Sequence, residues 1–217
     1  MGSDHIIETE LLRRYDRPGP RYTSYPTAPQ FSDRFGEAEL REAALRSNGD
    51  PIPRRLSLYL HVPFCMSPCF YCGCNRIITR DMARGEIYLA RLYREIELTS
   101  AMFDRDREVI QLHFGGGTPN FLSPKQLAEV VDVLRGHFRF SDAANRDLSI
   151  ELDPRFLKPD DVATLAAAGF NRASLGVQDF DPVVQDAVNR IQSIDETLAI
   201  IDACRRHGLR SVNADLI

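Results

Sequence analysis

The 217-residue sequence lacks the features that mark a protein of membranes, of nucleic acids or of the exterior. No apolar run approaches the roughly 18 residues of a membrane-spanning helix. There is no basic excess, because the formal net charge is −4, so neither nucleic acid nor an anionic membrane is an expected partner. The opening segment, MGSDHIIETELLRRYDR, has no apolar core of a secretory signal. We therefore expect a cytoplasmic, reducing location, where disulfides are disfavoured.

Cysteine is scarce but concentrated. Four of the five cysteines lie within "HVPFCMSPCFYCGCNR", residues 61–76, at Cys65, Cys69, Cys72 and Cys74. In a reducing compartment this clustering favours metal binding or catalysis over disulfide bonds. The first three follow the spacing C-x3-C-x2-C, and three thiolates can hold three corners of a cubane cluster while the fourth iron stays open. A zinc site with Cys74 or His61 as fourth ligand, and a closed cluster that includes Cys74, are alternatives.

The chain divides into an arm and an alternating region. Residues 1–55 carry six prolines between Arg17 and Pro53 and are predicted to form an N-terminal arm. From Leu56 onward the predicted strands are 56–62, 109–114, 147–153, 172–178 and 211–217. The predicted helices are 83–103, one from Ser123 with a capping box to Gln126, 160–168 closed by Gly169, and 194–207 closed by Gly208. This order predicts an α/β fold with a parallel sheet, open or rolled into a barrel.

Each predicted strand alternates apolar with polar residues. Parallel strands that are covered on both faces are usually apolar throughout, so the alternation predicts a sheet whose second face lines a polar cavity. The polar positions include Tyr59, His61, His113, Glu151 and Asp215. The second strand runs into GGGTP, residues 115–119, where missing side chains let the backbone approach a ligand closely. This turn matches neither of the common glycine-rich phosphate-binding motifs.

The motifs together resemble a known family. C-x3-C-x2-C after the first strand and GGGTP after the second are similar to the radical S-adenosylmethionine (SAM) superfamily. "GPRYTSYPTAPQF", "YCGCN", "IELDPR", "GVQDF", "VNR" and "ADLI" extend the resemblance to oxygen-independent coproporphyrinogen III oxidases (coproporphyrinogen dehydrogenases), from about residue 20 to the last residue. That family continues beyond "DLI" with another strand, more helices and a C-terminal domain, which these 217 residues do not include. Taken alone, the chain is therefore expected not to turn over substrate.

The resemblance implies a fold and a reaction. The fold is a partial TIM-like (β/α)6 barrel over residues 56–217, truncated after about five strands. Cys65, Cys69 and Cys72 would hold a [4Fe–4S] cluster whose open iron chelates SAM, and reductive cleavage of SAM would yield a 5′-deoxyadenosyl radical. The radical would take hydrogen from the β-carbon of two propionates of coproporphyrinogen III, and loss of CO2 and an electron would give the vinyl groups of protoporphyrinogen IX. A haem-binding or haem-delivery protein without turnover and a zinc-stapled binding module are the alternatives.

The resemblance also assigns residues. Contacts to the cluster-bound SAM fall on Tyr59, Gly116 and Glu151. Contacts to a second SAM fall on Tyr71, Gly117, Thr118, Gln178, Arg190 and Asp215. Cys74 is the expected catalytic residue outside the cluster, and Cys204 an inert buried thiol. Arg21, Tyr22 and Tyr25 would either strap the arm to the barrel or contact substrate. The full-length protein is expected to be a monomer, with an electron donor and acceptor that the sequence does not identify.

Overall fold

The structure, a computed structural model, describes residues 9–16 and 27–217, so Arg21, Tyr22 and Tyr25 lie outside the described residues. The chain divides into two compact units, Met1–Arg41 and Glu42–Ile217. The first unit contains α1 (Thr9–Tyr15), η1 (Ala28–Gln30) and the start of α2 (Glu37–Asn48), which continues into the second. The limit of the functional arm at residue 55 stays a prediction.

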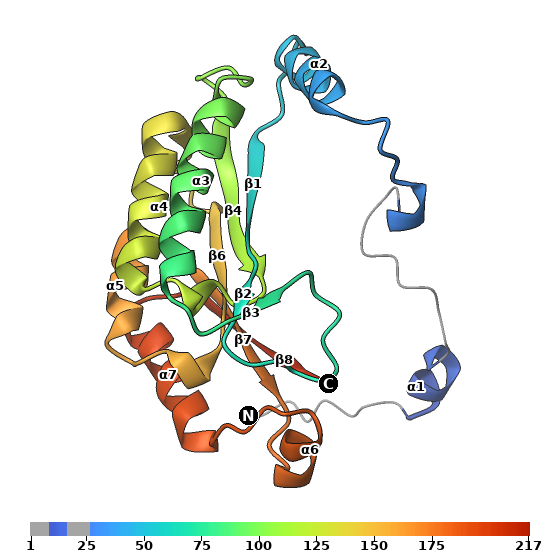
Figure 1. Cartoon of the computed structure of the whole chain (residues 1–217), viewed down its shortest axis with the longest axis vertical. Coiled ribbons are helices and arrows are strands. Elements are labelled where there is room, and N and C mark those ends of the chain that lie inside the picture. Colours follow the sequence, from blue (N-terminus) through green and yellow to red (C-terminus); the bar gives the residue numbers. More distant parts are fainter. Residues whose placement is uncertain (1–8, 17–26) are drawn as a thin grey trace. The chain divides into compact units, whose positions relative to one another are not determined.

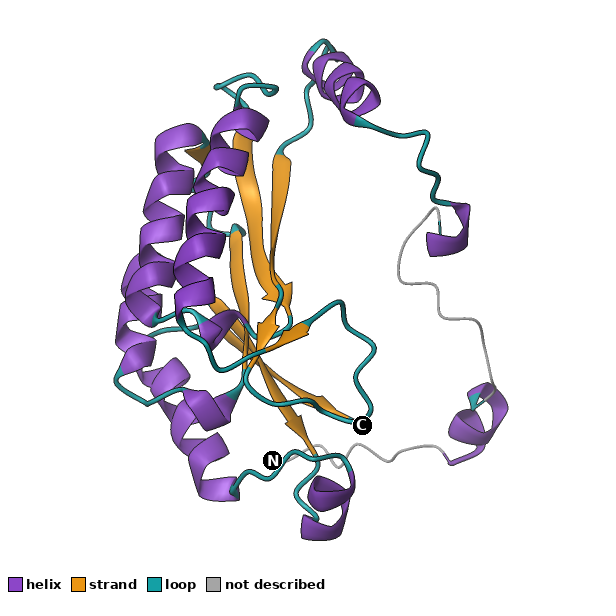
Figure 2. Cartoon of the chain, in the orientation of Figure 1, coloured by secondary structure: helices purple, strands orange, loops and turns teal. Residues whose placement is uncertain are grey.

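The second unit is built on a parallel sheet that forms part of a barrel (Figure 2). The order of its main strands is β1-β4-β6-β7-β8, and every pairing between them is parallel. Their bounds are β1 (Leu56–Val62), β4 (Glu108–Gly116), β6 (Asp147–Leu152), β7 (Arg172–Gln178) and β8 (Ser211–Leu216). A two-residue strand, β5 (Arg139–Phe140), was not predicted and pairs with the start of β4. The predicted α/β partial barrel is confirmed.

Four helices cover one face of this sheet (Figure 1): α3 (Ala83–Ser100), α4 (Pro124–His137), α5 (Asp161–Ala168) and α7 (Ile194–Arg206). The predicted capping box at the start of α4 is present, because Ser123 and Gln126 bond each other reciprocally. The predicted end of α5 is also present, with Gly169 in the left-handed region at φ 106°. The short helix α6 (Pro182–Ala187) was not predicted. None of the helices in the described ranges combines the length and hydropathy needed to span a membrane.

The apolar positions of the strands form the core beneath these helices. Leu112, Phe114, Ile150 and Leu175 are fully buried, as the alternation predicts for one face of the sheet. The polar positions between them are half-buried or exposed on the opposite face. On the edge strand β8 most residues are exposed, including Leu216 at 66%. One face of the sheet is thus packed, and the other is available to line a site.

Candidate active site

A loop between two very short strands carries the four clustered cysteines. We call residues 65–76 the cluster loop. It is closed by a parallel pairing of β2 (Phe64–Cys65) with β3 (Ile77–Ile78), in which the Thr79 N–H donates to the Cys65 carbonyl at 2.9 Å. Inside the loop, Arg76 Nη1 donates to the Cys72 carbonyl at 2.8 Å. These bonds hold the loop at the carboxyl end of β1.

The glycine turn after β4 lies directly against this loop. The Gly117 N–H donates to the Val62 carbonyl and the Thr118 N–H to the Phe64 carbonyl, both at 2.8 Å. A Cβ on Gly117 would lie 2.8 Å from the Phe64 carbonyl oxygen and 3.0 Å from Cys65 Sγ. Glycine at this position therefore permits the close approach of turn and loop that the sequence predicts.

The sulfurs of the three predicted cluster ligands each accept a hydrogen bond. Thr118 Oγ1 donates to Cys65 Sγ at 3.4 Å. Arg190 Nη1 donates to Cys69 Sγ at 3.5 Å. The Cys74 N–H donates to Cys72 Sγ at 3.5 Å. Such donors favour the thiolate, which is the form that binds metal. For Cys65, burial outweighs the Thr118 bond and raises the pKa of the free thiol.

The cysteine arrangement suits a cluster that has several iron atoms. Among the described residues, no three Cys, His, Asp or Glu side chains form a group that could hold one metal ion. A cubane cluster binds each thiolate to a different iron, so its ligands need not converge. Two features are compatible with a [4Fe–4S] cluster: each of the three cysteine sulfurs accepts a hydrogen bond, and Gly117 places no side chain beside Cys65.

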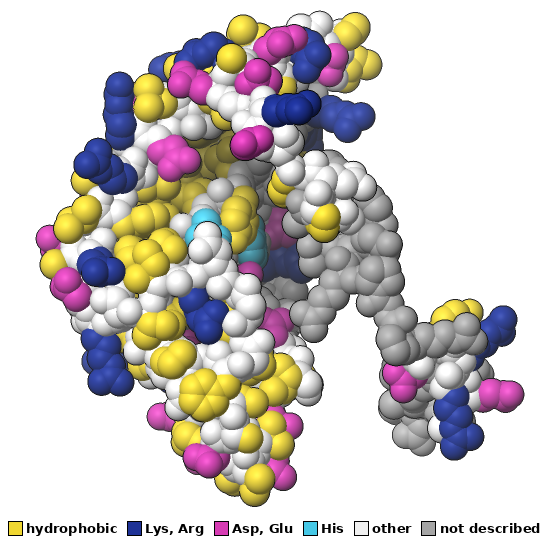
Figure 3. Space-filling model, turned by 45° about the vertical axis from the view of Figure 1, so that its right-hand side comes forward, with side chains coloured by type: hydrophobic (Ala, Val, Ile, Leu, Met, Phe, Trp, Pro, Cys, Tyr) yellow, Lys and Arg dark blue, Asp and Glu magenta, His cyan; other side chains and the backbone are white. Residues whose placement is uncertain are grey.

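The cluster loop and the glycine turn border a cavity of about 270 Å³, completed by the ends of β6, β7 and β8. Twelve of the thirteen predicted site residues line it: Cys65, Cys69, Tyr71, Cys72, Cys74, Gly116, Gly117, Thr118, Glu151, Gln178, Arg190 and Asp215. The exception is Tyr59, whose ring instead stacks on His113 with 5.8 Å between centroids. The space-filling view shows histidine side chains (cyan) next to hydrophobic side chains on the face that is turned forward (Figure 3). The structure thus gathers residues from positions 65 to 215 around one space.

Glu151 belongs to a polar network on the open face of the sheet. Its carboxylate accepts from the Gly116 N–H at 3.3 Å and lies 3.2 Å from His113 Nε2. His113 Nδ1 is in turn 2.8 Å from Ser149 Oγ. Burial, followed by the charge of Glu151, raises the pKa of Tyr59 above its ordinary value. His113 and Ser149 are members of this network to which the sequence assigned no role, although both occupy polar positions on their strands.

Cys74 and Tyr71 occupy the cavity side of the cluster loop. Cys74 is exposed, yet burial of its sulfur and its proximity to Cys72 raise its pKa to about 11. Burial, with Cys69 as second cause, raises the pKa of Tyr71 well above its usual range. Both groups are therefore protonated near neutral pH while no metal is bound.

Two further predicted contacts lie at the ends of the last strands. Gln178 ends β7 with a left-handed backbone, at φ 72°. The Asp215 carboxylate accepts from Ser174 Oγ at 3.0 and 2.9 Å. Both therefore belong to the open side of the sheet, at the cavity.

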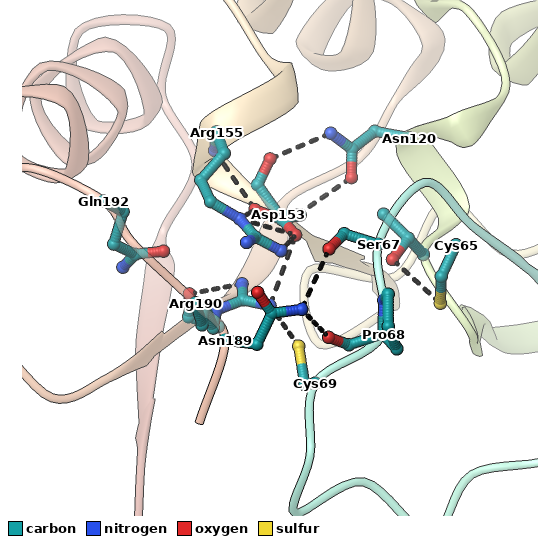
Figure 4. Close-up of polar contacts among 12 residues, drawn as sticks. Cys65, Ser67, Pro68, Cys69, Asn120, Asp153, Arg155, Asn189, Arg190 and Gln192 are labelled. Atoms are coloured by element: carbon teal, nitrogen blue, oxygen red, sulfur yellow. Dashed lines mark hydrogen bonds and ion pairs between the residues drawn. The ribbon is translucent and has the colours of Figure 1, made fainter. Parts of the chain in front are cut away.

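A buried polar cluster behind Cys69 was missed by sequence reasoning (Figure 4). Asn120, Asp153 and Arg190 are buried, Arg155 and Asn189 beside them are half-buried, and of these five residues only Arg190 was given a role. The "DPR" and "VNR" motifs contain four of these five residues. The residue types alone, however, do not reveal that Arg155 and Arg190, which are 35 positions apart, both pair with the buried carboxylate of Asp153.

Comparison with known proteins assigns the fold to a family. The family model described as the radical SAM superfamily matches residues 59–217. Oxygen-independent coproporphyrinogen III oxidase of Pseudomonas aeruginosa is 51% identical over 97% of this chain, and that of Escherichia coli (strain K12) is 44% identical over 95%. The solved structure of the Escherichia coli coproporphyrinogen III oxidase, titled a radical SAM enzyme, aligns with a TM-score of 0.83 and 42% identity over 95% of this chain.

The matches cover the whole described sheet but only part of the relatives. The chain spans 45% of the Pseudomonas aeruginosa protein, 44% of the Escherichia coli protein and 45% of the solved chain. The family model begins at Tyr59, inside β1, and covers every later strand, with the cluster loop and the glycine turn inside the matched range. The chain belongs to the radical SAM superfamily.

Proposed function

We propose that this chain forms the cluster- and SAM-binding part of an oxygen-independent coproporphyrinogen III oxidase. The observation that carries the proposal is the meeting of the C-x3-C-x2-C loop with the glycine turn at one cavity, where Gly117 leaves no room for a side chain beside Cys65. The names of the relatives at 51% and 44% identity support the particular member of the superfamily.

Cys65, Cys69 and Cys72 would hold a [4Fe–4S] cluster, and the cluster, when bound, supplies the electron for reductive cleavage of SAM. Glu151 would accept hydrogen bonds from the ribose hydroxyls or the ammonium group of SAM. It is suited to this because its carboxylate is fixed by Gly116 and His113 but still faces the cavity. Gly116 and Tyr59 are the other proposed contacts of this first SAM molecule.

A second SAM molecule would contact Tyr71, Gly117, Thr118, Gln178, Arg190 and Asp215. All six line the same cavity, which supports a shared ligand. Cys74 would serve the reaction directly, in hydrogen transfer or in placement of the second SAM, because its thiol is exposed and lines the cavity.

The substrate reaction is oxidative decarboxylation of two propionate side chains. Hydrogen leaves the β-carbon of each propionate, and then CO2 and one electron leave, so that a vinyl group remains. The chain contributes by orienting SAM and limiting water at the cavity, while the cofactor supplies the bond-breaking chemistry. The identity of the electron donor and acceptor, a monomeric state and a cytoplasmic location stay predictions.

The test is an anaerobic assay of the full-length protein. After reconstitution with iron and sulfide, the reduced protein is incubated with SAM and coproporphyrinogen III. We expect protoporphyrinogen IX, 5′-deoxyadenosine and CO2. Haem binding with no 5′-deoxyadenosine would instead support a haem-delivery protein and contradict the proposed reaction.

A further inference from the structure

Three consecutive residues after α6 contact three consecutive residues of the cluster loop. The bonds run from the Phe70 N–H to the Val188 carbonyl (3.1 Å), from Asn189 Nδ2 to the Pro68 carbonyl (2.7 Å) and from Arg190 Nη1 to Cys69 Sγ (3.5 Å). Asn189 adopts a left-handed backbone, at φ 55°, which asparagine tolerates better than most residues. Residues 188–190 therefore form a clamp on the middle of the cluster loop.

Arg190 is held in this clamp by a buried carboxylate. Its side chain is only 8% exposed, and Nη1 lies 3.2 Å from Asp153 Oδ2 while Nη2 donates to the Gly176 carbonyl at 2.7 Å. The guanidinium is planar and its donors diverge in fixed directions, so these two partners set which donor faces Cys69 (Figure 4). Asp153 thus determines how Arg190 meets the sulfur.

Asp153 is itself fixed on both sides. Its backbone N–H donates to Asn120 Oδ1 at 2.9 Å, and its carbonyl accepts from Asn120 Nδ2 at 3.0 Å. Its carboxylate accepts from Arg155 Nε at 3.0 Å and from Arg155 Nη2 at 2.7 Å. With its side chain 5% exposed, Asp153 is an anchor rather than a mobile ion-pair partner.

The positive and negative charges of the buried polar side chains around Asp153 are unequal in number. Arg155 and Arg190 carry two positive charges, and Asp153 supplies one negative charge. A buried unpaired charge is costly, so the remaining positive charge needs a partner. Arg190 already donates to Cys69 Sγ, and a metal-bound thiolate there would complete the balance. Of the three hydrogen bonds to the cysteine sulfurs described above, the one from Arg190 has a charged donor, and the Arg155 guanidinium also interacts with Cys69.

We propose that Asp153 is a positioning residue for the iron–sulfur cluster, holding Arg190 so that its guanidinium donates to the Cys69 sulfur and raises the reduction potential of the cluster. The inference rests on the proposed cluster site and adds to it a control of potential. The physical basis is that hydrogen bonds and positive charge at a cluster thiolate stabilise the reduced, more negative state.

The sign of the potential shift tests this idea in the reconstituted full-length protein. Removal of a nearby carboxylate charge alone makes a cluster easier to reduce. Asp153→Ala is expected to do the opposite, a shift to a more negative potential, because Arg190 loses its anchor and leaves the sulfur. Arg190→Gln is expected to shift the potential in the same negative direction. The measurement is a redox titration followed by electron paramagnetic resonance, with iron and sulfide content determined for each variant.

A double variant and a matched control separate positioning from general damage. In the Arg190→Gln background, Asp153→Ala should no longer shift the potential to more negative values. Asp147→Asn removes a carboxylate that pairs with Arg172 at the other end of β6, and it should leave the potential unchanged. An equal shift in this control, or the same negative shift from Asp153→Ala in both backgrounds, contradicts the proposal.

The outcomes distinguish this inference from the proposed function. If the wild-type protein binds no four-iron cluster, both are overturned. If it binds the cluster and Asp153→Ala gives an unchanged or more positive potential, only the positioning role is overturned. If Asp153→Ala does not fold, Arg190→Gln decides, and an unchanged potential in that variant rejects the proposal.

Discussion

At the scale of single residues, Glu151 makes the most direct prediction about SAM. Glu151→Gln keeps the shape of the side chain but removes the charge that faces the cavity. We expect SAM binding to weaken by about 1.5–3 kcal/mol, the usual contribution of a hydrogen bond to a charged group. Calorimetry on cluster-loaded protein measures this loss, with Glu129→Gln on the exposed side of α4 as control. Equal SAM affinity of Glu151→Gln and wild type, with the cluster intact, would contradict the contact.

Cys74 tests whether the cluster keeps an open iron. If three thiolates suffice, Cys74→Ser retains about four iron and four sulfide per chain, while the full-length protein loses turnover. The exposed position of Cys74 is consistent with a thiol outside the cluster. Loss of iron from the serine variant, measured after anaerobic reconstitution, would make Cys74 a ligand and remove the argument for an open iron.

Cys204 has a different environment from the clustered thiols. It belongs to α7, its side chain is fully buried, and burial raises its pKa to about 11. Because the folded-state pKa lies above the ordinary value of 9.0, the thiolate stays scarce at pH 8. We expect iodoacetamide to leave Cys204 unlabelled at pH 8 in the native protein and to label it in urea, as read by peptide mass spectrometry. Rapid native labelling would show that the core opens at α7.

At the scale of elements, the glycine turn should be less tolerant of substitution than the helices. Gly117→Ala brings a methyl group against the Phe64 carbonyl and Cys65 Sγ, so the cluster loop must move and iron content should fall. Gly136→Ala in α4 is the matched control, since its Cβ would meet no atom within 4 Å. The control should keep its iron and gain roughly 0.5–1 kcal/mol of unfolding free energy, measured with urea. Equal iron content in the two variants would contradict a tight turn.

The same elements show how far sequence reasoning extends. Alternation predicted the buried and open faces of β4 and β6, because side chains of a strand alternate strictly between its two faces. The capping box of α4 was readable because its two partners are three positions apart. The clamp of residues 188–190 and its anchor Asp153 was not readable. It depends on segments that approach only when β6, α6 and the cluster loop meet at one sheet edge, and a left-handed Asn189 leaves no periodic signal.

At the scale of the whole chain, one sheet explains why distant motifs work together. Because the strands are parallel, their carboxyl ends bring the cluster loop, the glycine turn, Glu151 and Asp215 to the same edge. The helices α3, α4, α5 and α7 occupy the other face (Figure 1), so the polar positions are left to line a cavity. The central claim is therefore that Cys65, Cys69 and Cys72 hold one iron–sulfur cluster at this edge.

Iron and sulfide analysis of the anaerobically reconstituted full-length protein, with its visible spectrum, tests that claim most directly. We expect about four iron and four sulfide per chain in the wild type. We also expect loss of the cluster when any one of Cys65, Cys69 or Cys72 is changed to Ala. One zinc per chain with no sulfide would contradict it.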